Sequence, residues 1–162
     1  MTAPAPTGPF FRRGVTKYVA CPIVNDLAAP TREEIAGGTP MTGVTNVSGF
    51  AITRSFLDTP DLDSDFTSNI PGERKAGESA LTFKDKRAAS KAIRDALSAD
   101  TGTGFTMVYM PYGDVPGERC ECWPVVSGGV NDQVDMNTFA QYQVGFATPE
   151  PPEQAAVIPA AA

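Results

Sequence analysis

The residues that could do chemistry are few, and the most regular group is a run of oxygen-bearing side chains at alternate positions: Asp61, Asp63, Asp65, Thr67 and Asn69. Calcium-binding EF-hand loops space their ligands in this way. Such a loop also needs glycine at its sixth position and a bidentate glutamate at its twelfth, where this sequence has Phe66 and Gly72. We therefore expect no metal site, and an acidic loop that faces solvent or a charged partner.

Nucleophilic and redox chemistry have equally little support. The chain has no histidine, so the commonest general base is missing, and no Gly-x-Ser-x-Gly elbow or phosphate-binding loop occurs. Cys120 and Cys122 are too close for a Cys-x-x-Cys metal knuckle, and Cys21 completes no second pair. The sequence predicts small buried thiols made in a reducing, cytosolic compartment, and no enzyme, catalytic residue or cofactor.

Charge and composition exclude further classes of protein. The 162 residues carry a net charge of −6, and four aspartates lie between residues 58 and 65 without a cation. Tight binding of nucleic acid depends on Lys and Arg, so this balance argues against it. The first fourteen residues, MTAPAPTGPFFRRG, lack the apolar region of a signal peptide, and no later run is long enough to span a bilayer. We expect a soluble protein without membrane insertion.

The elements that would position these residues are mostly strands. Apolar alternation bounded by turn residues predicts strands over residues 15–24, 41–57, 79–84, 105–110, 119–127 and 134–147. Thr31 and Glu34 form the pattern of a capping box, which predicts a short helix ended by Gly37-Gly38. A second helix is predicted over residues 85–99, with Asp85 as its cap.

The order of these elements predicts a mainly β fold: an antiparallel β-sandwich or barrel with one flanking α-helix and a long inter-strand loop. Residues 14–148 form the domain, between an N-terminal arm at 1–13 and a Pro-rich C-terminal tail at 149–162. Phe10-Phe11 in the arm can dock on the core or on a neighbour, and Trp123 belongs in the core.

The long loop is predicted between Asp58 and Gly77, where breakers and charges leave no convincing secondary structure. Structureless loops of about twenty residues are uncommon in compact domains and are usually functional or disordered. Leu62, Phe66 and Ile70 recur four apart within it, so the loop has apolar side chains to bury. We expect a subunit contact, built from Asp58, Leu62, Phe66, Ile70, Pro71, Arg74 and Lys75.

Several segments, in their order along the chain, resemble phage tail tube proteins, the major tail proteins of long non-contractile tails. They are RGVTKY (13–18), PTREEI (30–35), SFLDT (55–59), IPGERKAGESALTF (70–83), IRDAL (93–97), WPVV (123–126) and FAQYQVGF (139–146). The likeness spans roughly residues 12–148. It implies a structural virion protein whose hexameric rings stack into a tube around a lumen, the conduit for DNA ejection. The long loop then reaches the adjacent subunit or ring.

The resemblance also implies partners and a location. They are further copies of the chain, a tape measure protein and DNA in the lumen, and terminator and distal tail proteins at the ends. The protein would be made and assembled in the host cytoplasm. Because Lys and Arg would retain DNA, we expect acidic residues to line or rim the lumen, with Asp114, Glu118, Glu121, Asp132 and Asp135 as candidates. Residues 41–57 and 134–147 are the expected inner-sheet strands.

Three alternatives stay open. The chain could form the inner tube of a contractile tail or injection system, or a tail terminator that stops at one ring. From a different class, it could be a discrete β-sandwich binding module, such as a receptor-binding or decoration protein. Tube length separates the first two, and the module would stay a discrete oligomer at high concentration.

Overall fold

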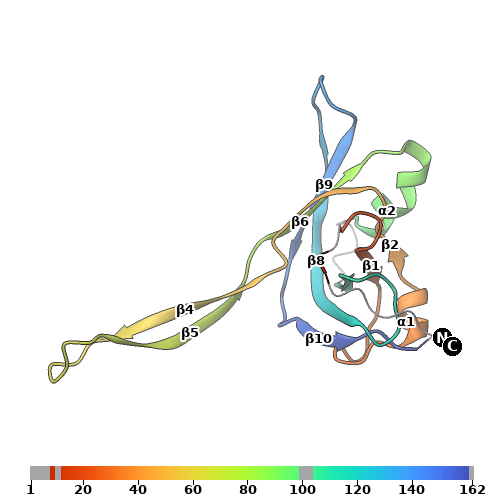
Figure 1. Ribbon diagram of the computed structural model, residues 1–162. Coiled ribbons are helices and arrows are strands. Elements are labelled where there is room, and N and C mark those ends of the chain that lie inside the picture. The colour runs from red at the N-terminus through yellow and green to blue at the C-terminus, as the bar shows by residue number, and fades with distance from the viewer. Residues whose placement is uncertain (1–7, 10–11, 99–103, 161–162) are drawn as a thin grey trace. The chain divides into compact units, whose positions relative to one another are not determined.

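The computed structural model describes residues 8–9, 12–98 and 104–160 (Figure 1). They divide into two compact units. Unit 1 comprises residues 1–41, 105–123 and 152–162, and unit 2 comprises residues 42–104 and 124–151. Strands dominate the described part of both units, and each strand pairing whose register is described is antiparallel, so the predicted mainly β, antiparallel fold class is confirmed.

Unit 1 is built on antiparallel strands with one short helix. Its elements are β1 (Lys17–Cys21), α1 (Arg32–Ala36), β2 (Thr39–Pro40), β7 (Phe105–Met110), the first residues of β8 (Arg119–Gln133) and β10 (Glu153–Val157). β1 pairs with β2 on one side and β7 on the other, where Val19 faces Val108 in register. The inward-facing side chains of these elements form the core of unit 1. They are Val19, Cys21, Ile35, Val108, Met110, Cys120, Cys122, Ala156 and Ile158.

The α1 helix begins as the sequence predicts. The hydroxyl of Thr31 accepts a hydrogen bond from the backbone N–H of Glu34, and the Glu34 carboxylate accepts one from the backbone N–H of Thr31. This reciprocal bonding is the capping box, and Gly37 caps the other end. These bonds, with another from the backbone N–H of Asn25, lower the pKa of the Glu34 carboxyl.

The prediction for the C-terminal segment was wrong. Residues 149–162 were expected to form a polar tail, but residues 153–157 form β10, which pairs with β8. Ala156 faces Cys120 in the register, and both Ala156 and Ile158 are buried. Pairing with β8 orders this segment despite its proline content. The predicted docking of Phe10-Phe11 lies outside the described residues.

Unit 2 contains a four-stranded antiparallel sheet, a two-stranded sheet and a helical segment. Its elements are β3 (Val44–Ser48), β4 (Ile52–Thr59), β5 (Ser68–Ala76), β6 (Ser79–Lys84), η1 (Arg87–Ser90), α2 (Lys91–Ala96), the rest of β8 and β9 (Gln141–Ala147). The sheet order is β8-β9-β6-β3. Both β6 and β7 occupy the residues predicted for them, whereas the helix predicted over 85–99 is a 3₁₀ turn and a shorter α-helix.

One face of the unit 2 sheet is apolar and carries the core. Leu81, Phe83, Tyr142 and Val144 alternate along β6 and β9 and are fully buried, as is Leu97 beyond α2. Arg94 of α2 lies over the Tyr142 ring, 4.5 Å from its centroid. Its guanidinium also donates to Asp85 at 3.0 Å and Asp132 at 2.5 Å. One cationic side chain thus joins the helix to the strands. The described residues contain no helix long and apolar enough to cross a membrane.

Two predicted long strands are divided or shortened. The strand expected over 41–57 is interrupted between β3 and β4, where Gly49 and Phe50 both adopt positive φ angles of 76° and 53°. The strand expected over 134–147 begins only at residue 141, because β8 continues to Gln133 and an exposed loop follows. The first change matters most, because it turns the chain out of the sheet and into β4.

Candidate assembly interface

The β4–β5 hairpin is the most unusual element of unit 2. Residues 58–77 were predicted to lack secondary structure, which was wrong: β4 and β5 pair from Ile52–Ala76 to Thr59–Ser68. Of these residues, only 60–67 and Gly77 are outside the strands. Figure 1 shows the hairpin extending away from the rest of unit 2, and most of its side chains are exposed. We call residues 58–69 the tip of the hairpin and residues 52–57 and 70–76 its stem. The predicted subunit-contact residues all lie on the stem or the tip.

The register assigns these residues to two faces. On one face Arg54 pairs with Arg74, and Phe56 pairs with Pro71. The register shifts between these two pairs. On the opposite face Leu57 faces Ile70 and Thr53 faces Lys75. The remaining predicted contact residues lie toward the tip: Asp58, Leu62 and Phe66. Both faces therefore combine apolar and charged side chains.

Large apolar side chains of the hairpin are solvent-exposed. The exposed fractions are 64% for Phe56, 57% for Leu57, 104% for Leu62, 73% for Phe66 and 51% for Ile70. Clustered exposed apolar residues mark interaction sites in soluble proteins, whereas scattered single ones are ordinary. A two-stranded hairpin is also marginally stable by itself in water. Both facts point to a partner that covers the hairpin.

The base of the hairpin is fixed by close backbone packing. A Cβ on Gly49 would lie 2.2 Å from the carbonyl oxygen of Glu78, so only glycine fits where the chain passes β6. The backbone N–H of Phe50 donates to the Ser79 hydroxyl at 2.9 Å, and the Gly77 N–H donates to the Ala51 carbonyl at 3.2 Å. These bonds set the point at which the hairpin leaves unit 2.

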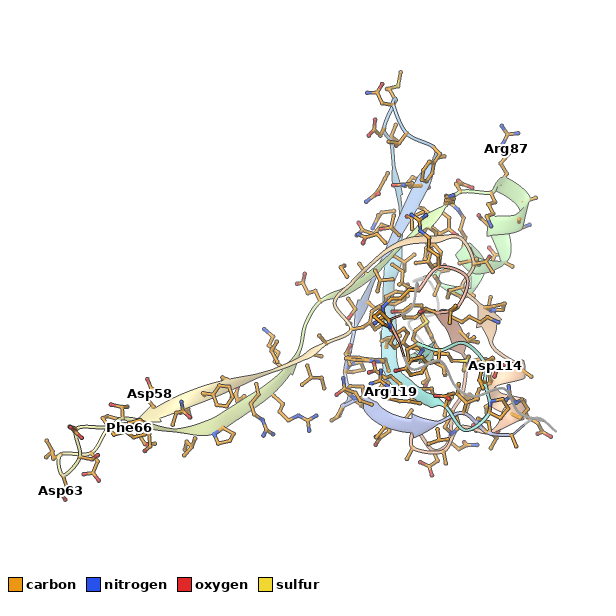
Figure 2. All side chains as sticks on the ribbon, in the orientation of Figure 1. Asp58, Asp63, Phe66, Arg87, Asp114 and Arg119 are labelled. Atoms are coloured by element: carbon orange, nitrogen blue, oxygen red, sulfur yellow. The ribbon has the colours of Figure 1, made fainter. Side chains whose placement is uncertain are left out.

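The hairpin is electrically asymmetric. Its tip carries aspartates alone among charged residues, and Figure 2 shows Asp63 at the extreme end with Asp58 behind it. Its stem carries Arg54, Arg74 and Lys75 against one carboxylate, Glu73. Within the described part of the chain, none of these three cations forms an ion pair. A negative end and a positive stem therefore belong to the same exposed element.

The five candidate lumen acids lie in different surroundings. In unit 1, Asp114 is ion-paired with Arg32 at 2.8 Å, Glu118 is half-buried, and Glu121 is buried and accepts a hydrogen bond from the Trp123 indole. In unit 2, Asp132 is bound by Arg94, while Asp135 is exposed and accepts from the backbone N–H of Asn137. Glu118 and Asp135 are the two candidates without an ion pair among the described residues, and of these two only Asp135 is exposed.

The three cysteines are buried free thiols, and Trp123 is fully buried, as expected. Burial raises the pKa of the Cys21 thiol to about 11. A hydrogen bond with Cys120, and then burial, raise the pKa of the Cys122 thiol. Among the residues that the structure describes, no cluster of three His, Cys, Asp or Glu side chains could hold a metal ion.

The unit 2 sheet also presents an open edge and a polar face. β3 ends the sheet order, so its outer edge has no strand partner among the described residues. In the β6–β9 register, Thr82 faces Gln143 and Lys84 faces Gln141, and Gln143 also faces Asn131 of β8. Gln133 donates to Gln143 at 3.1 Å. Amides thus dominate the face opposite the core. The alternation of residues 141–147 in the sequence could have indicated this polar face.

A family model described as phage tail tube protein matches residues 4–161, nearly the whole chain. The chain belongs to the phage tail tube protein family. The resemblance inferred from the sequence is thereby confirmed, and so is the function it implied at this level: a structural component of a phage tail. No curated protein matches the chain.

Solved structures support the tail tube fold. A chain in the tail of an empty gene transfer agent particle, refined with C6 symmetry, superposes with a TM-score of 0.54 at 10% identity, covering 88% of this chain and 95% of that one. The SPP1 tail tube gives 0.55 at 13% identity, with coverages of 89% and 78%. The baseplate structure of the anti-feeding prophage gives 0.52 at 10% identity, with coverages of 93% and 95%. At these identities the likeness establishes the fold.

Proposed function

We propose that this tail tube protein polymerises as stacked hexameric rings into the tail tube of a long non-contractile tail, the conduit through which DNA leaves for the host cell. The observation that carries this proposal is the exposed β4–β5 hairpin, whose apolar residues have no cover within unit 2. The sixfold symmetry of the matched gene transfer agent tail supports rings of six. The protein acts without catalysis and without a cofactor.

The hairpin supplies the contact between subunits. Phe56, Leu57 and Ile70 become buried when the hairpin lies against another copy, which contributes the favourable free energy of association. The unpaired edge of β3 can be closed by a strand of the neighbouring subunit, which removes an edge that would otherwise invite uncontrolled pairing. Assembly therefore covers the apolar residues of the hairpin and pairs the edge of β3, both of which the single chain leaves open to solvent.

The tube works with other tail components. Inside the lumen it encloses a tape measure protein and later the passing DNA, and its ends meet terminator and distal tail proteins. Half-buried Glu118 and exposed Asp135 remain candidates for the lining or rim. A wall without excess Lys or Arg lets phosphates pass without being retained. The protein is made in the host cytoplasm and resides in the virion tail.

Replacement of residues 53–75 by Asn-Gly tests the contact, because Ile52 and Ala76 face one another and a two-residue turn can join such a pair. The variant should unfold cooperatively at a temperature close to that of the wild type and form no tubes in negative-stain images. Wild-type protein at equal concentration is the positive control. Tubes of normal diameter from the shortened variant would refute the role of the hairpin.

A further inference from the structure

Two arginines oppose each other directly on the hairpin. Arg54 of β4 and Arg74 of β5 are a register pair, so their Cβ atoms lie within about 5.5 Å of each other. Like charges in this position destabilise an isolated hairpin. Both side chains are exposed, and neither has an ion pair among the described residues. The hairpin therefore carries a concentrated positive site on the face that also bears Phe56.

Paired guanidiniums are suited to carboxylates. Arg presents planar N–H donors that bind a carboxylate through two parallel hydrogen bonds, and a second Arg beside it adds charge attraction. A carboxylate between Arg54 and Arg74 would also remove their mutual repulsion. The gain on binding is thus larger than for a single exposed ion pair.

We propose that this arginine pair binds the acidic tip of the β4–β5 hairpin of a second copy of the chain, at Asp61 and Asp63. This inference rests on the proposed self-assembly and names the chemistry of one of its contacts. The tip has the complementary composition, because residues 58–65 contain four aspartates and no cation. Leu62 and Phe66, both exposed, accompany these carboxylates and can contact the apolar side chains of the same stem.

The contact has to be made between chains. An antiparallel strand rises about 3.4 Å per residue, so Arg54 and the end of β4 at Thr59 are about 17 Å apart. An ion pair needs its nitrogen and oxygen within about 4 Å. Figure 2 shows Asp63 farther out still, beyond Asp58 and Phe66. The tip carboxylates therefore cannot reach the arginines of their own stem, but they can form ion pairs with the stem of another copy.

The geometry of such a contact agrees with tube formation. Tip and stem are different patches of one molecule, so a contact of one tip with one stem is heterologous, and the joined pair of copies keeps one unused tip and one unused stem. Heterologous contacts close into rings or continue as filaments. A self-complementary patch would instead stop at a dimer.

A charge exchange tests the inference, with the critical concentration for polymerisation measured by sedimentation. The variant R54E/R74E and the variant D61R/D63R should each raise that concentration by at least about tenfold, because each places like charges in the contact. The four-residue combination restores opposite charges and should return the concentration to within about threefold of wild type. Lys75→Glu, on the other face of the same stem, is the matched control and should change it little.

A second measurement separates this contact from a defect in the hairpin itself. The single change R54E places a carboxylate opposite Arg74 and should slow hydrogen exchange of the β4–β5 amides in the monomer. The same change should weaken polymerisation, so the two effects have opposite directions. A merely unfolded hairpin would show faster exchange.

Three results would overturn the inference. They are R54E/R74E polymerising like the wild type, a four-residue combination no better than its parents, and Lys75→Glu as damaging as the arginine changes. Each leaves the proposed function standing as long as wild-type protein forms tubes that the shortened hairpin abolishes. Wild-type protein that stays monomeric at every concentration would instead overturn the proposed function.

Discussion

Truncation of Phe56 to alanine should weaken assembly more than it weakens the fold. Phe56 is 64% exposed in the single chain, so the smaller part of its surface contributes to folding. Complete burial of a phenylalanine side chain contributes about 1.5–3 kcal/mol, and covering the exposed part in the subunit contact contributes about 1–2 kcal/mol. Because 1.4 kcal/mol corresponds to a factor of ten, the critical concentration should rise about 5- to 25-fold.

Sedimentation of polymer over a range of total concentrations measures this shift, and denaturant unfolding of the dilute monomer measures the fold. The free energy of unfolding should fall by no more than about 0.5–1 kcal/mol, because only about a third of the side chain is covered in the single chain. Ile23→Ala is the control, because Ile23 is 69% exposed but lies in unit 1. Equal shifts for both variants, or none for Phe56→Ala, would refute burial of Phe56 in the contact.

Three further outcomes follow from the geometry. Gly49→Ala should destabilise the protein by more than about 1 kcal/mol in thermal or denaturant unfolding, because its positive φ and the 2.2 Å approach to Glu78 admit no side chain, whereas Gly77→Ala, with no atom near its Cβ position, should change stability little. Leu97→Ala should lower the free energy of unfolding by about 2–5 kcal/mol in urea, because Leu97 is fully buried; a change below 1 kcal/mol would contradict this core assignment. Glu34→Gln should make the free energy of unfolding depend less on pH under acidic conditions. Because the pKa of Glu34 is lowered in the folded state, its carboxylate stabilises the fold at pH values above the ordinary pKa of about 4.3, and this contribution is lost as the pH falls through the folded-state pKa. Parallel pH profiles for variant and wild type would contradict the capping role of Glu34.

Elements governed by local chemistry were predictable from the sequence. The Thr31–Glu34 capping box depends on side chains three residues apart, so its pattern fully specifies it. β6 was also predictable, because one face of it enters the core and leaves an alternating pattern. The Cys120 and Cys122 thiols follow the same rule, since residues two apart on a strand share a face.

Elements governed by distant partners were missed. β10 forms because β8 offers hydrogen bonds to a segment whose composition is typical of a tail. The residues around Ala156 carry no pattern that predicts this pairing. The helix after β6 was predicted too long, because apolar spacing cannot show where a 3₁₀ turn replaces the first α-helical turn. The division of residues 41–57 depends on the contact of Gly49 with Glu78, which lies far along the chain.

The hairpin shows why sequence reasoning singled out residues 58–77 but misjudged their form. A strand in a domain has a core on at least one face and therefore alternates, whereas β4 and β5 have no core on either face. Under the proposed assembly their apolar residues contact another copy of the chain. Their opposed Arg54 and Arg74 destabilise the hairpin when it is alone. Natural sequences break local rules mainly where function requires it. The departures at Phe50, Phe56 and Arg54–Arg74 all occur in this hairpin or at its base. Under the proposed assembly, the stable form of this element is the assembled one, and the single chain is the wrong reference state for it.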